Sequence, residues 1–490
     1  MSIFTAACRP GPLRPLIPSL ARALAAAAAG FGGWTSSYPT SALAGQGGWL
    51  IAGRRGRARG IVVGWRGRVP PWARRLPAER DRHPATRSFG VRRNSDGSLG
   101  PALTVMLLPG NHAVLAALQS AIPWLSPVPA GRGPSLGMGD RTGYATPGHV
   151  LDLGSSRLFP VFAQQSVREM TRTGRSPDDV MDDAVFGVLA AGWRRGWGAD
   201  ADHLKVGADI DRMAAAGFVR FTLDASPALR PGAERLATPA DRFGPAVPFL
   251  AKLARRVRRA MGRNPFEIEV SLDELPVETR PEDHEFVVRA LAARAVRVCA
   301  VAPRFPGSFE KGVGYRGSRS AFRRALAAHV AVARRCGGYA ISVHSGSDKF
   351  TVYRDVARIT RGRFHVKTAG TSWLEALRVV ARRDPALFRE VVACARLVFP
   401  AARLSYHVSA TLRDIPTPRR VSDRRLESVY LDRPFPRQIL HVAFGSILGT
   451  FDDKGFVFRD RIHRILALNE SVHRAVLVRH LGRHVRLLRP

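Results

Sequence analysis

Cysteine is scarce in this chain of 490 residues. The four cysteines, Cys8, Cys299, Cys336 and Cys394, lie far apart in the sequence and form no Cys-x-x-Cys pair. Four residues are too few to staple a chain of this length, so a disulfide-based fold is excluded and a reducing, cytoplasmic location is expected. The composition is otherwise that of a globular protein, with 45% hydrophobic and 23% charged residues.

Long apolar runs are also missing. The apolar stretch at residues 19–34 is interrupted by Arg22, is rich in Ala and Gly, and is shorter than the roughly 20 residues that a membrane-spanning helix needs. We therefore expect no membrane partner.

Acidic residues are few beside the basic ones, 39 Asp plus Glu against 76 Lys plus Arg, which gives a formal charge of +37. A basic chain invites a nucleic-acid interpretation. Here the excess is spread along the chain, with one short basic run at residues 53–60, and there is neither zinc-finger spacing nor an RNA-recognition strand. We expect no specific nucleic-acid partner.

Lysine is the rarer of the two basic residues, with six copies among the 76. Four of the six, Lys205, Lys311, Lys349 and Lys367, fall inside polar motifs. Lysine is a compact charge whose pKa shifts readily on burial, whereas arginine stays protonated. Because the chain uses arginine almost everywhere else, lysine at these four positions indicates chemistry there.

From about residue 157 onward, short runs alternate apolar with polar residues and are followed by segments of helical period. Such crossovers predict parallel strands, and a polar face on every strand predicts an enclosed polar centre. The candidate strands span residues 160–166, 199–206, 219–226, 267–274, 296–303, 339–350, 364–370 and 404–410. Eight strands in about 250 residues predict an α/β fold, a (β/α)8 TIM-type barrel, with an open doubly wound sheet as the alternative.

The regions beside the barrel differ in texture. Residues 1–134 are rich in Arg, Gly and Ala, and their short apolar runs at 47–53, 60–65 and 102–108 predict strands of an accessory region. The barrel is expected over 135–445, followed by a helical extension over 446–490.

Three histidines, His203, His344 and His407, lie at or near the carboxyl ends of predicted strands. These ends meet at one mouth of a closed barrel, and converging neutral imidazoles are a common way to hold a divalent metal such as Zn, Mn, Ni or Fe. The alternative for each histidine is a hydrogen-bonded structural role.

Proton transfer at a substrate carbon needs a general acid and a general base. We expect Asp202 and Glu310 to fill these roles, because Asp202 adjoins His203 and Glu310 follows the fifth strand. Asp202 could instead orient a metal-bound imidazole, and Asp224 and Asp273 could cap helices.

The segment Gly312–Gly317 fits the Gly-x-Gly-x-x-Gly pattern of a dinucleotide loop. No acid follows between Glu310 and Asp348, so the carboxylate that would bind a ribose is missing and no dinucleotide cofactor is expected.

Eight blocks in order resemble the tagaturonate/fructuronate epimerase family of hexuronate metabolism. They are GMGDRTGYATPGH from Gly137, FAQQSVREMTRTGRSPDDV from Phe162, GADADHLK from Gly198, FEKGVGY from Phe309, HSGSDKF from His344, VKTAGTSWLEALR from Val366, SYHVSA from Ser405 and RQILHVAFG from Arg437. The resemblance covers roughly residues 135 to 445.

This resemblance implies a metal-dependent isomerase that inverts carbon 4 of a keto-hexuronate. It implies His203, His344 and His407 as metal ligands, Asp202 as base and Glu310 as acid. Further substrate-binding residues are Arg168 for the carboxylate, Lys205, Lys349 and Lys367 for charge compensation, and Asp273 and Asp348. The alternatives are another metal-dependent ketose isomerase or aldolase on the same barrel, and an inactive basic binding protein.

Overall fold

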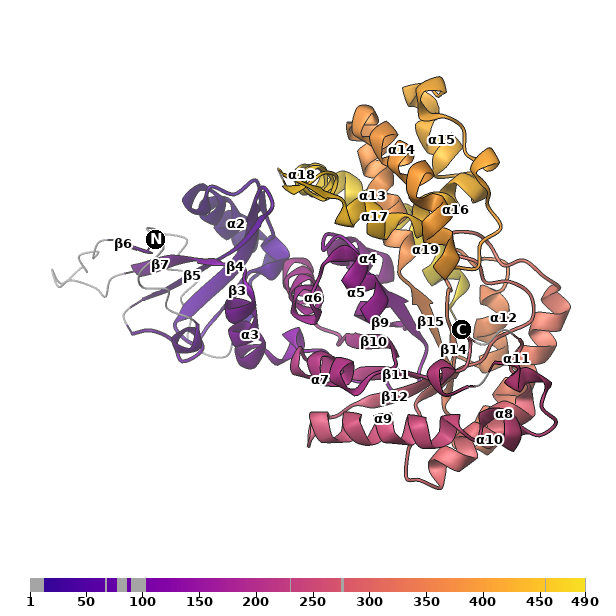
Figure 1. Ribbon diagram of the computed structural model, residues 1–490. Helices are drawn as coiled ribbons and strands as arrows, with labels where there is room; N and C mark the ends of the chain where they lie inside the picture. The colour runs from indigo at the N-terminus through magenta and orange to yellow at the C-terminus, as the bar shows by residue number, and fades with distance from the viewer. Residues whose placement is uncertain are drawn as a thin grey trace. The chain divides into compact units, whose positions relative to one another are not determined.

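The computed structural model describes residues 13–66, 68–76, 86–89, 103–229, 231–274, 277–453 and 455–489. This part of the chain forms two compact units (Figure 1). The first comprises residues 1–126 and 182–195, and the second comprises residues 127–181 and 196–490. Cys8 lies outside the described residues. None of the described helices combines the length and the apolar character that a membrane crossing requires.

The first unit is built on an antiparallel sheet. Its strands are β1 (Arg14–Pro15), β2 (Ser36–Ser37), β3 (Leu43–Gly45), β4 (Gly48–Arg55), β5 (Ala58–Arg66), β6 (Thr86–Phe89) and β7 (Leu103–Pro109). Helices α2 (Pro18–Gly32) and α3 (His112–Ala121) accompany the sheet. The three apolar runs expected as strands correspond to β4, β5 and β7, whose side chains alternate across the sheet because the period of a strand is two.

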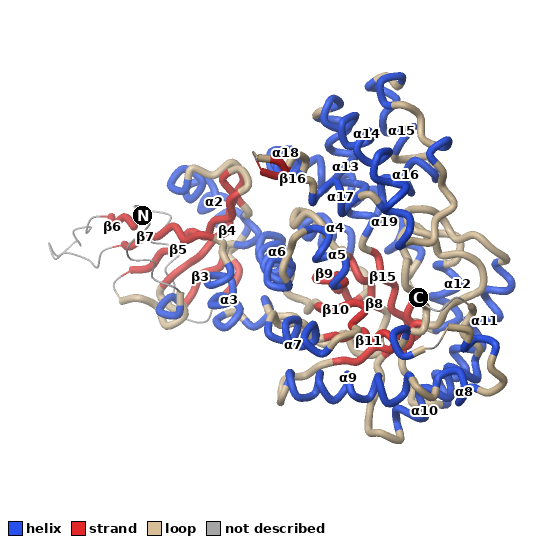
Figure 2. The backbone as a smooth tube through the Cα atoms, in the orientation of Figure 1, coloured by secondary structure: helices blue, strands red, loops and turns tan. Residues whose placement is uncertain are grey.

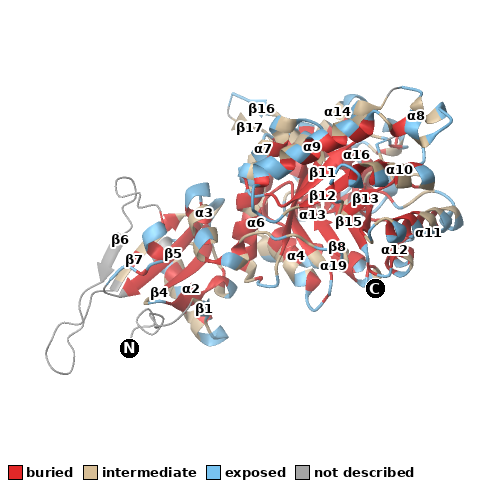
Figure 3. Cartoon of the chain, turned by 90° about the horizontal axis from the view of Figure 1, so that it is seen from below, coloured by how far each residue is buried: buried red, intermediate tan, exposed pale blue. Residues whose placement is uncertain are grey.

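The second unit contains a closed barrel of parallel strands, drawn in red in Figure 2, which confirms the expected fold class. The barrel strands among the described residues are β8 (Ser135–Met138), β9 (Phe159–Ser166), β10 (Gly198–Leu204), β11 (Arg220–Asp224), β12 (Glu267–Ser271), β13 (Ala300–Ala302), β14 (Ala340–Val343) and β15 (Phe364–Thr368). These strands are almost entirely buried, as Figure 3 shows, because helices cover the outside and polar side chains fill the inside.

Helices of the second unit surround the barrel and continue past it. Those between or directly after the strands are α4 (Thr146–Leu153), α5 (Val167–Thr173), α7 (Gly207–Ala215), α8 (Pro239–Phe243), α9 (Ala246–Met261), α10 (Pro281–Ala292), α11 (Arg319–Arg335), α12 (Tyr353–Thr360) and α13 (Gly370–Arg383). Helix α6 (Pro177–Ala191) begins in the second unit, and its residues from 182 onward belong to the first. After α13 the chain forms α14 (Pro385–Ala402), α15 (Leu426–Tyr430), α16 (Pro434–Val442), α17 (Phe444–Gly449), α18 (Arg459–Leu468) and α19 (Glu470–Leu487). A separate apolar core joins α13 to these later helices.

One predicted strand is wrong. Residues 404–410 form the end of a short 3-10 helix (Arg403–Ser405) and a loop. The missing strand is instead β8, which pairs with both β15 and β9 and so closes the barrel. Once β8 fills this place, no sheet edge remains for residues 404–410 to join.

The loop after β14 is fastened to the C-terminal helices through Asp348. The Asp348 carboxylate is 2.8 Å from Nη2 of Arg437 in α16 and 2.6 Å from Nε2 of His480 in α19, and its backbone N–H donates to Nε2 of His484. Burial raises the pKa of Asp348, but Arg437 and His480 together hold it well below the usual aspartate range. The expected substrate-binding residue Asp348 is thus committed to packing α16 and α19 against the barrel loop.

The next residue in the loop, Lys349, is fully buried. Its Nζ donates to the carbonyl oxygens of Glu310 at 2.8 Å, Val313 at 2.7 Å and Ser347 at 2.9 Å. Burial lowers the pKa of Lys349 to about 7. The side chain therefore ties the loops after β13 and β14 together.

We predict that Asp348→Asn lowers the free energy of unfolding by about 3 kcal/mol at pH 7, because it removes the nearer of the two carboxylates beside the buried Arg437 and leaves only Glu375, at 3.6 Å. Asparagine also tolerates the positive φ of 62° at this position, so the substitution tests the charge alone. A carboxylate with a depressed pKa contributes stability above its unfolded pKa and loses that contribution as pH falls. Urea unfolding should therefore show a gap between wild type and variant that shrinks below about pH 4, and a gap independent of pH would contradict the role given to Asp348.

We also predict that Lys349→Met destabilises the protein by about 3 kcal/mol, because it leaves buried carbonyl groups unsatisfied. Lys252→Met is the matched control, since Lys252 is exposed on α9. Unfolding in urea measures both. Unchanged stability with a raised KM would instead place Lys349 at the substrate.

Candidate active site

The carboxyl ends of the barrel strands surround a polar pocket, as expected for a barrel of this type. It is lined by Arg141, Gln164, Ser166, Arg168, Glu169, Asp202, His203, Asp273, Glu274, Lys311, His344, Ser345, Ser347, Lys367, Ala369, Gly370, Tyr406 and His441. A second pocket shares seven of these residues and extends the mouth toward His407 and Phe309.

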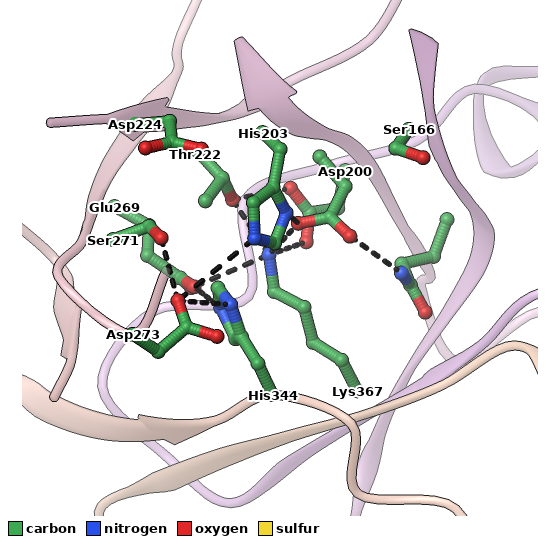
Figure 4. Close-up of polar contacts among 12 residues, drawn as sticks. Ser166, Asp200, His203, Thr222, Asp224, Glu269, Ser271, Asp273, His344 and Lys367 are labelled. Carbon is green, nitrogen blue, oxygen red and sulfur yellow. Dashed lines mark hydrogen bonds and ion pairs between the residues drawn. The ribbon is translucent and has the colours of Figure 1, made fainter. Parts of the chain in front are cut away.

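Lys367 of β15 lies inside the barrel and contacts three other strands (Figure 4). Its Nζ is 2.8 Å from Asp200 Oδ2, 2.7 Å from Asp202 Oδ1 and 3.2 Å from Glu269 Oε1, and it donates to Thr222 Oγ1 at 2.7 Å. Burial disfavours the ammonium form, but the three carboxylates raise the pKa of Lys367 above its ordinary value. The polar strand faces predicted from the sequence therefore meet around one buried cation.

Two of these carboxylates orient the site's imidazoles. Asp202 Oδ1 is 2.8 Å from His203 Nδ1, and Glu269 Oε1 is 2.6 Å from His344 Nε2. Burial raises the pKa of both carboxyl groups, but the histidines and Lys367 lower it well below the usual range. Each carboxylate thus accepts a hydrogen bond from one ring N–H of its histidine. The other ring nitrogen, Nε2 of His203 and Nδ1 of His344, does not contact that carboxylate.

The two imidazoles lie side by side, with ring centroids 4.9 Å apart. Asp273 Oδ1 is 2.9 Å from His344 Nδ1 and 3.8 Å from His203 Nε2, and it accepts a hydrogen bond from Ser271. Within the described chain, His344 Nδ1 is buried without a hydrogen-bond partner of good geometry. Burial lowers the pKa of His344, yet Asp273 and Glu269 raise it to about 10. The ring nitrogens therefore face a place that favours positive charge.

Metal-ligating residue types gather at this place. Asp202, His203 and His344 each offer a donor atom within 4.8 Å of the others. Asp202 is already engaged by Lys367 and by His203 Nδ1, so Asp273 is the freer oxygen donor. Two imidazole nitrogens and one carboxylate suit Zn, Mn, Fe or Ni.

His203 reaches this position through an irregular backbone. Its φ is 55°, in the left-handed region, and the pairing of β10 with β11 shifts register between Ala201 and Leu204. A bulge of this kind turns a side chain away from the regular alternation of the strand. Asp202 and His203 are consequently able to lie in contact although they are neighbours in sequence.

His407 is not joined to the other two histidines. It is exposed in the loop after the Arg403–Ser405 turn, and it lines only the outer pocket. The strand predicted to carry it into the barrel mouth does not form, for the reason given above.

Glu310 also points elsewhere. Its carboxylate accepts hydrogen bonds from N and Oγ of Ser409 and from Nε2 of Gln438, and it does not line either pocket. These donors lower the pKa of Glu310 although burial raises it. Glu310 holds the loop at residues 406–410 against α16, and the structure does not bring it to Asp202.

The remaining expected residues divide between the pocket and its rim. Arg168, Asp273 and Lys367 line the pocket. Lys205 does not line it; its Nζ lies 3.2 Å from Asp224 Oδ2, and its side chain is half-exposed. Asp224 also accepts a hydrogen bond from the backbone N–H of Ser226, two residues on in the turn after β11.

Several pocket residues were not singled out from the sequence. Glu274 is one of them and lies outside the family blocks; four others are Arg141, Gln164, Glu169 and His441. All four fall inside blocks that carry the family resemblance, Arg141 in GMGDRTGYATPGH and His441 in RQILHVAFG. The blocks were a usable signal, but they did not indicate which of their residues face the substrate.

Comparisons with known proteins identify the family. The family model for tagaturonate epimerase matches residues 78–241 and 233–488. A curated relative, the tagaturonate/fructuronate epimerase of Thermotoga maritima, is 38% identical over 446 residues, which cover 83% of this chain and 90% of the relative.

Solved structures of the fructuronate-tagaturonate epimerase of Cohnella laeviribosi are similar along nearly their whole length. A glycerol complex superposes with a TM-score of 0.84 at 31% identity, and the native enzyme with 0.83 at 32% identity; each match covers 95% of this chain and 99% of the other. The chain belongs to the tagaturonate epimerase family and is an isomerase of the epimerase class.

Proposed function

We propose that this epimerase interconverts tagaturonate and fructuronate by inverting carbon 4, and that His203, His344 and Asp273 hold a divalent cation for the reaction. The observation that carries the proposal is the pair of adjacent imidazoles, each backed by its own carboxylate. Such carboxylate–histidine pairs fix the ring and the tautomer of a metal ligand.

The donor chemistry fits this cation. His344 Nδ1 is a buried nitrogen without a good hydrogen-bond partner in the described structure, and Asp273 is ionised because its pKa is depressed by His344 and His203 despite burial. When bound, a divalent metal supplies a Lewis acid that stabilises negative charge on substrate oxygens. Elemental analysis of the purified protein distinguishes Zn, Mn, Ni and Fe.

Carbon 4 of a 2-keto hexuronate is not adjacent to the ketone, so removal of an α-proton does not invert it. A retro-aldol route does. The hydroxyl on carbon 4 loses its proton, the bond between carbons 3 and 4 breaks, its electron pair enters an enediolate of carbons 1 to 3, and carbon 4 becomes an aldehyde. After the aldehyde turns over, the same bond forms again and the proton returns.

Lys367 supports this route by its charge. Its ammonium stays protonated among three carboxylates and lines the pocket, so it offsets negative charge that develops on the substrate.

We assign to Glu274 the removal and the return of the proton on the carbon 4 hydroxyl. Asp202 serves better as the residue that orients His203, because its depressed pKa makes it a weak base. Glu274 lies at the pocket mouth with its side chain about one third exposed, 3.6 Å from His203 Nε2, 3.7 Å from Arg168 and 3.8 Å from Lys205. A carboxylate at the mouth that a substrate can reach suits proton transfer.

The free thiols of Cys299, Cys336 and Cys394 support a reducing compartment, and we place the reaction in the cytoplasm. We further propose that the ligand is a small sugar acid, because many charged groups line the pocket.

We predict that His344→Ala loses at least nine tenths of the bound metal and lowers kcat at least about 100-fold, because it removes a ligand and leaves Glu269 without its partner. His407→Ala is the matched control and should keep wild-type metal content, since His407 is exposed in a loop away from the donors. Elemental analysis of the purified proteins measures the first effect. Turnover of tagaturonate, with the configuration at carbon 4 and any trapped three-carbon aldehyde followed, measures the second.

Full metal content and turnover in His344→Ala would remove His344 from the ligand set. Loss of metal in His407→Ala with retention in His344→Ala would restore the ligand set expected from the sequence. A wild-type protein that cleaves the sugar without inverting carbon 4 would be an aldolase.

A further inference from the structure

We infer that the carboxylate of the sugar acid binds to Arg141, Lys311 and the N-terminus of α13, a subsite that we call the basic wall. The inference rests on the proposed function, because it takes a keto-hexuronate as the ligand. It differs from the expectation drawn from the sequence, in which Arg168 was the carboxylate-binding residue.

The charged groups of the pocket divide between two sides. His203, His344 and Asp273 form the side that holds the metal in the proposed function. The residues that remain include four cations, Arg141, Arg168, Lys311 and Lys367, and three carboxylates, Glu169, Asp202 and Glu274. Asp202 is paired with Lys367, and Glu274 lies 3.7 Å from Arg168, so Arg141 and Lys311 share the one carboxylate of Glu169. This half of the pocket therefore has more positive than negative charge and calls for an anion.

Arg141 is the most deeply placed of these cations, with 4% of its surface exposed. Its Nε donates to Glu169 Oε1 at 2.9 Å, and Nη2 donates to the same oxygen. Its guanidinium carbon lies 3.6 Å from the centre of the Phe444 ring. In the described structure, Nη1 is buried without a hydrogen-bond partner. A buried guanidinium with an unused donor at the pocket is the group that a substrate carboxylate would satisfy.

The loop that carries Arg141 is rigid. The Asp140 carboxylate accepts hydrogen bonds from the backbone N–H groups of Thr142, Gly143 and Ala145, at 2.8, 3.0 and 2.6 Å. Gln165 Nε2 donates to the Asp140 carbonyl. A donor fixed in advance binds its ligand with less loss of conformational entropy.

Lys311 supplies the second charge. Its Nζ donates to Ser345 Oγ at 2.9 Å, and Ser345 follows His344 in the sequence, so this part of the basic wall adjoins the imidazole side of the pocket. Burial lowers the pKa of Lys311; Glu169 raises it, and Arg168 and Arg141 lower it further. A bound carboxylate would relieve this repulsion among cations.

Helix α13 contributes its N-terminus. It is 14 residues long, begins after Ala369 without a side-chain cap, and exposes Ala369 and Gly370 to the pocket. Uncapped N–H groups at a helix start attract anions. His441 packs so closely on Gly370 that a Cβ atom there would overlap its ring, and both residues line the pocket at the start of the helix. Burial and the nearby cations lower the pKa of His441 well below its ordinary value, so the ring is neutral.

This arrangement orients the substrate. In a 2-keto hexuronate the carboxylate is carbon 6, two bonds beyond carbon 4, and the ketone lies two bonds away on the other side. With the carboxylate at the basic wall, carbon 4 faces the centre of the pocket and the keto end faces His203 and His344. The residues proposed for both ends of the substrate line the same pocket, so the inference needs no second site.

Binding of D-gluconate, a six-carbon carboxylate, and of sorbitol, its neutral counterpart, tests the inference by calorimetry on the metal-loaded protein. We expect wild type to bind gluconate at least tenfold more tightly than sorbitol. Arg141→Gln and Lys311→Met should each weaken gluconate binding by at least about tenfold and leave sorbitol binding within about threefold. Arg168→Gln is the matched comparison, because Arg168 lines the same pocket nearer its exposed mouth, and its loss should be smaller than about threefold.

Several results overturn the inference. They are a wild type that does not distinguish gluconate from sorbitol, an Arg141→Gln variant with wild-type affinity for gluconate, and a larger loss in Arg168→Gln than in Arg141→Gln. If Arg141→Gln fails to fold because Glu169 loses its counter-ion, the double variant Arg141→Gln with Glu169→Gln removes both charges, and Lys311→Met keeps the test independent.

Turnover separates this inference from the proposed function. Discrimination by Arg141 in a protein that does not epimerise tagaturonate would retain the basic wall and reject the reaction. Epimerisation with a KM for tagaturonate that Arg141→Gln leaves unchanged would retain the reaction and reject the basic wall.

Discussion

The buried ammonium of Lys367 is the contact on which the site depends. It lies inside the barrel among Asp200, Asp202 and Glu269, which come from two other strands. Without this cation, three carboxylates in a space closed to water would repel one another and take up protons. With it they remain ionised, and two of them hold His203 and His344 by their ring N–H groups. One lysine thus sets the protonation and the direction of both imidazoles.

The barrel does not complete the pocket by itself. Helix α16 supplies His441 to the pocket. Phe444, the first residue of α17, covers the Arg141 guanidinium with its ring. Gln438, also from α16, binds Glu310, and α19 reaches the loop after β14 through His480. The helices that follow β15, the last strand of the barrel, are therefore part of the active site as well as a covering layer. A barrel enzyme of this kind uses its extension to fix loops that would otherwise move.

The fold was largely predictable, and the error has a physical cause. Alternating apolar and polar residues identified four of the barrel strands because buried strands of a closed sheet need one apolar face and one lumen face, and three further short runs completed the correctly placed set. Strand β8 escaped because its four residues, SLGM, are too few for a pattern to stand out. Residues 404–410 alternate clearly but find no sheet edge. The site followed the same logic: His203, His344, Asp202 and Lys367 sit on or next to correctly placed strands, whereas His407 and Glu310 lie in loops whose path local pattern does not determine.

The contact between Gly370 and His441 links two positions that are distant in the sequence. Because the imidazole occupies the space where any other residue would carry its Cβ atom, neither side chain is free to enlarge alone. Evolution along this lineage must change the two together or leave both untouched. An aligned set of orthologues should therefore show these two columns either both invariant or changing together, and a chimaera that takes α13 from one parent and α16 from another inherits whatever mismatch the parents have at this junction.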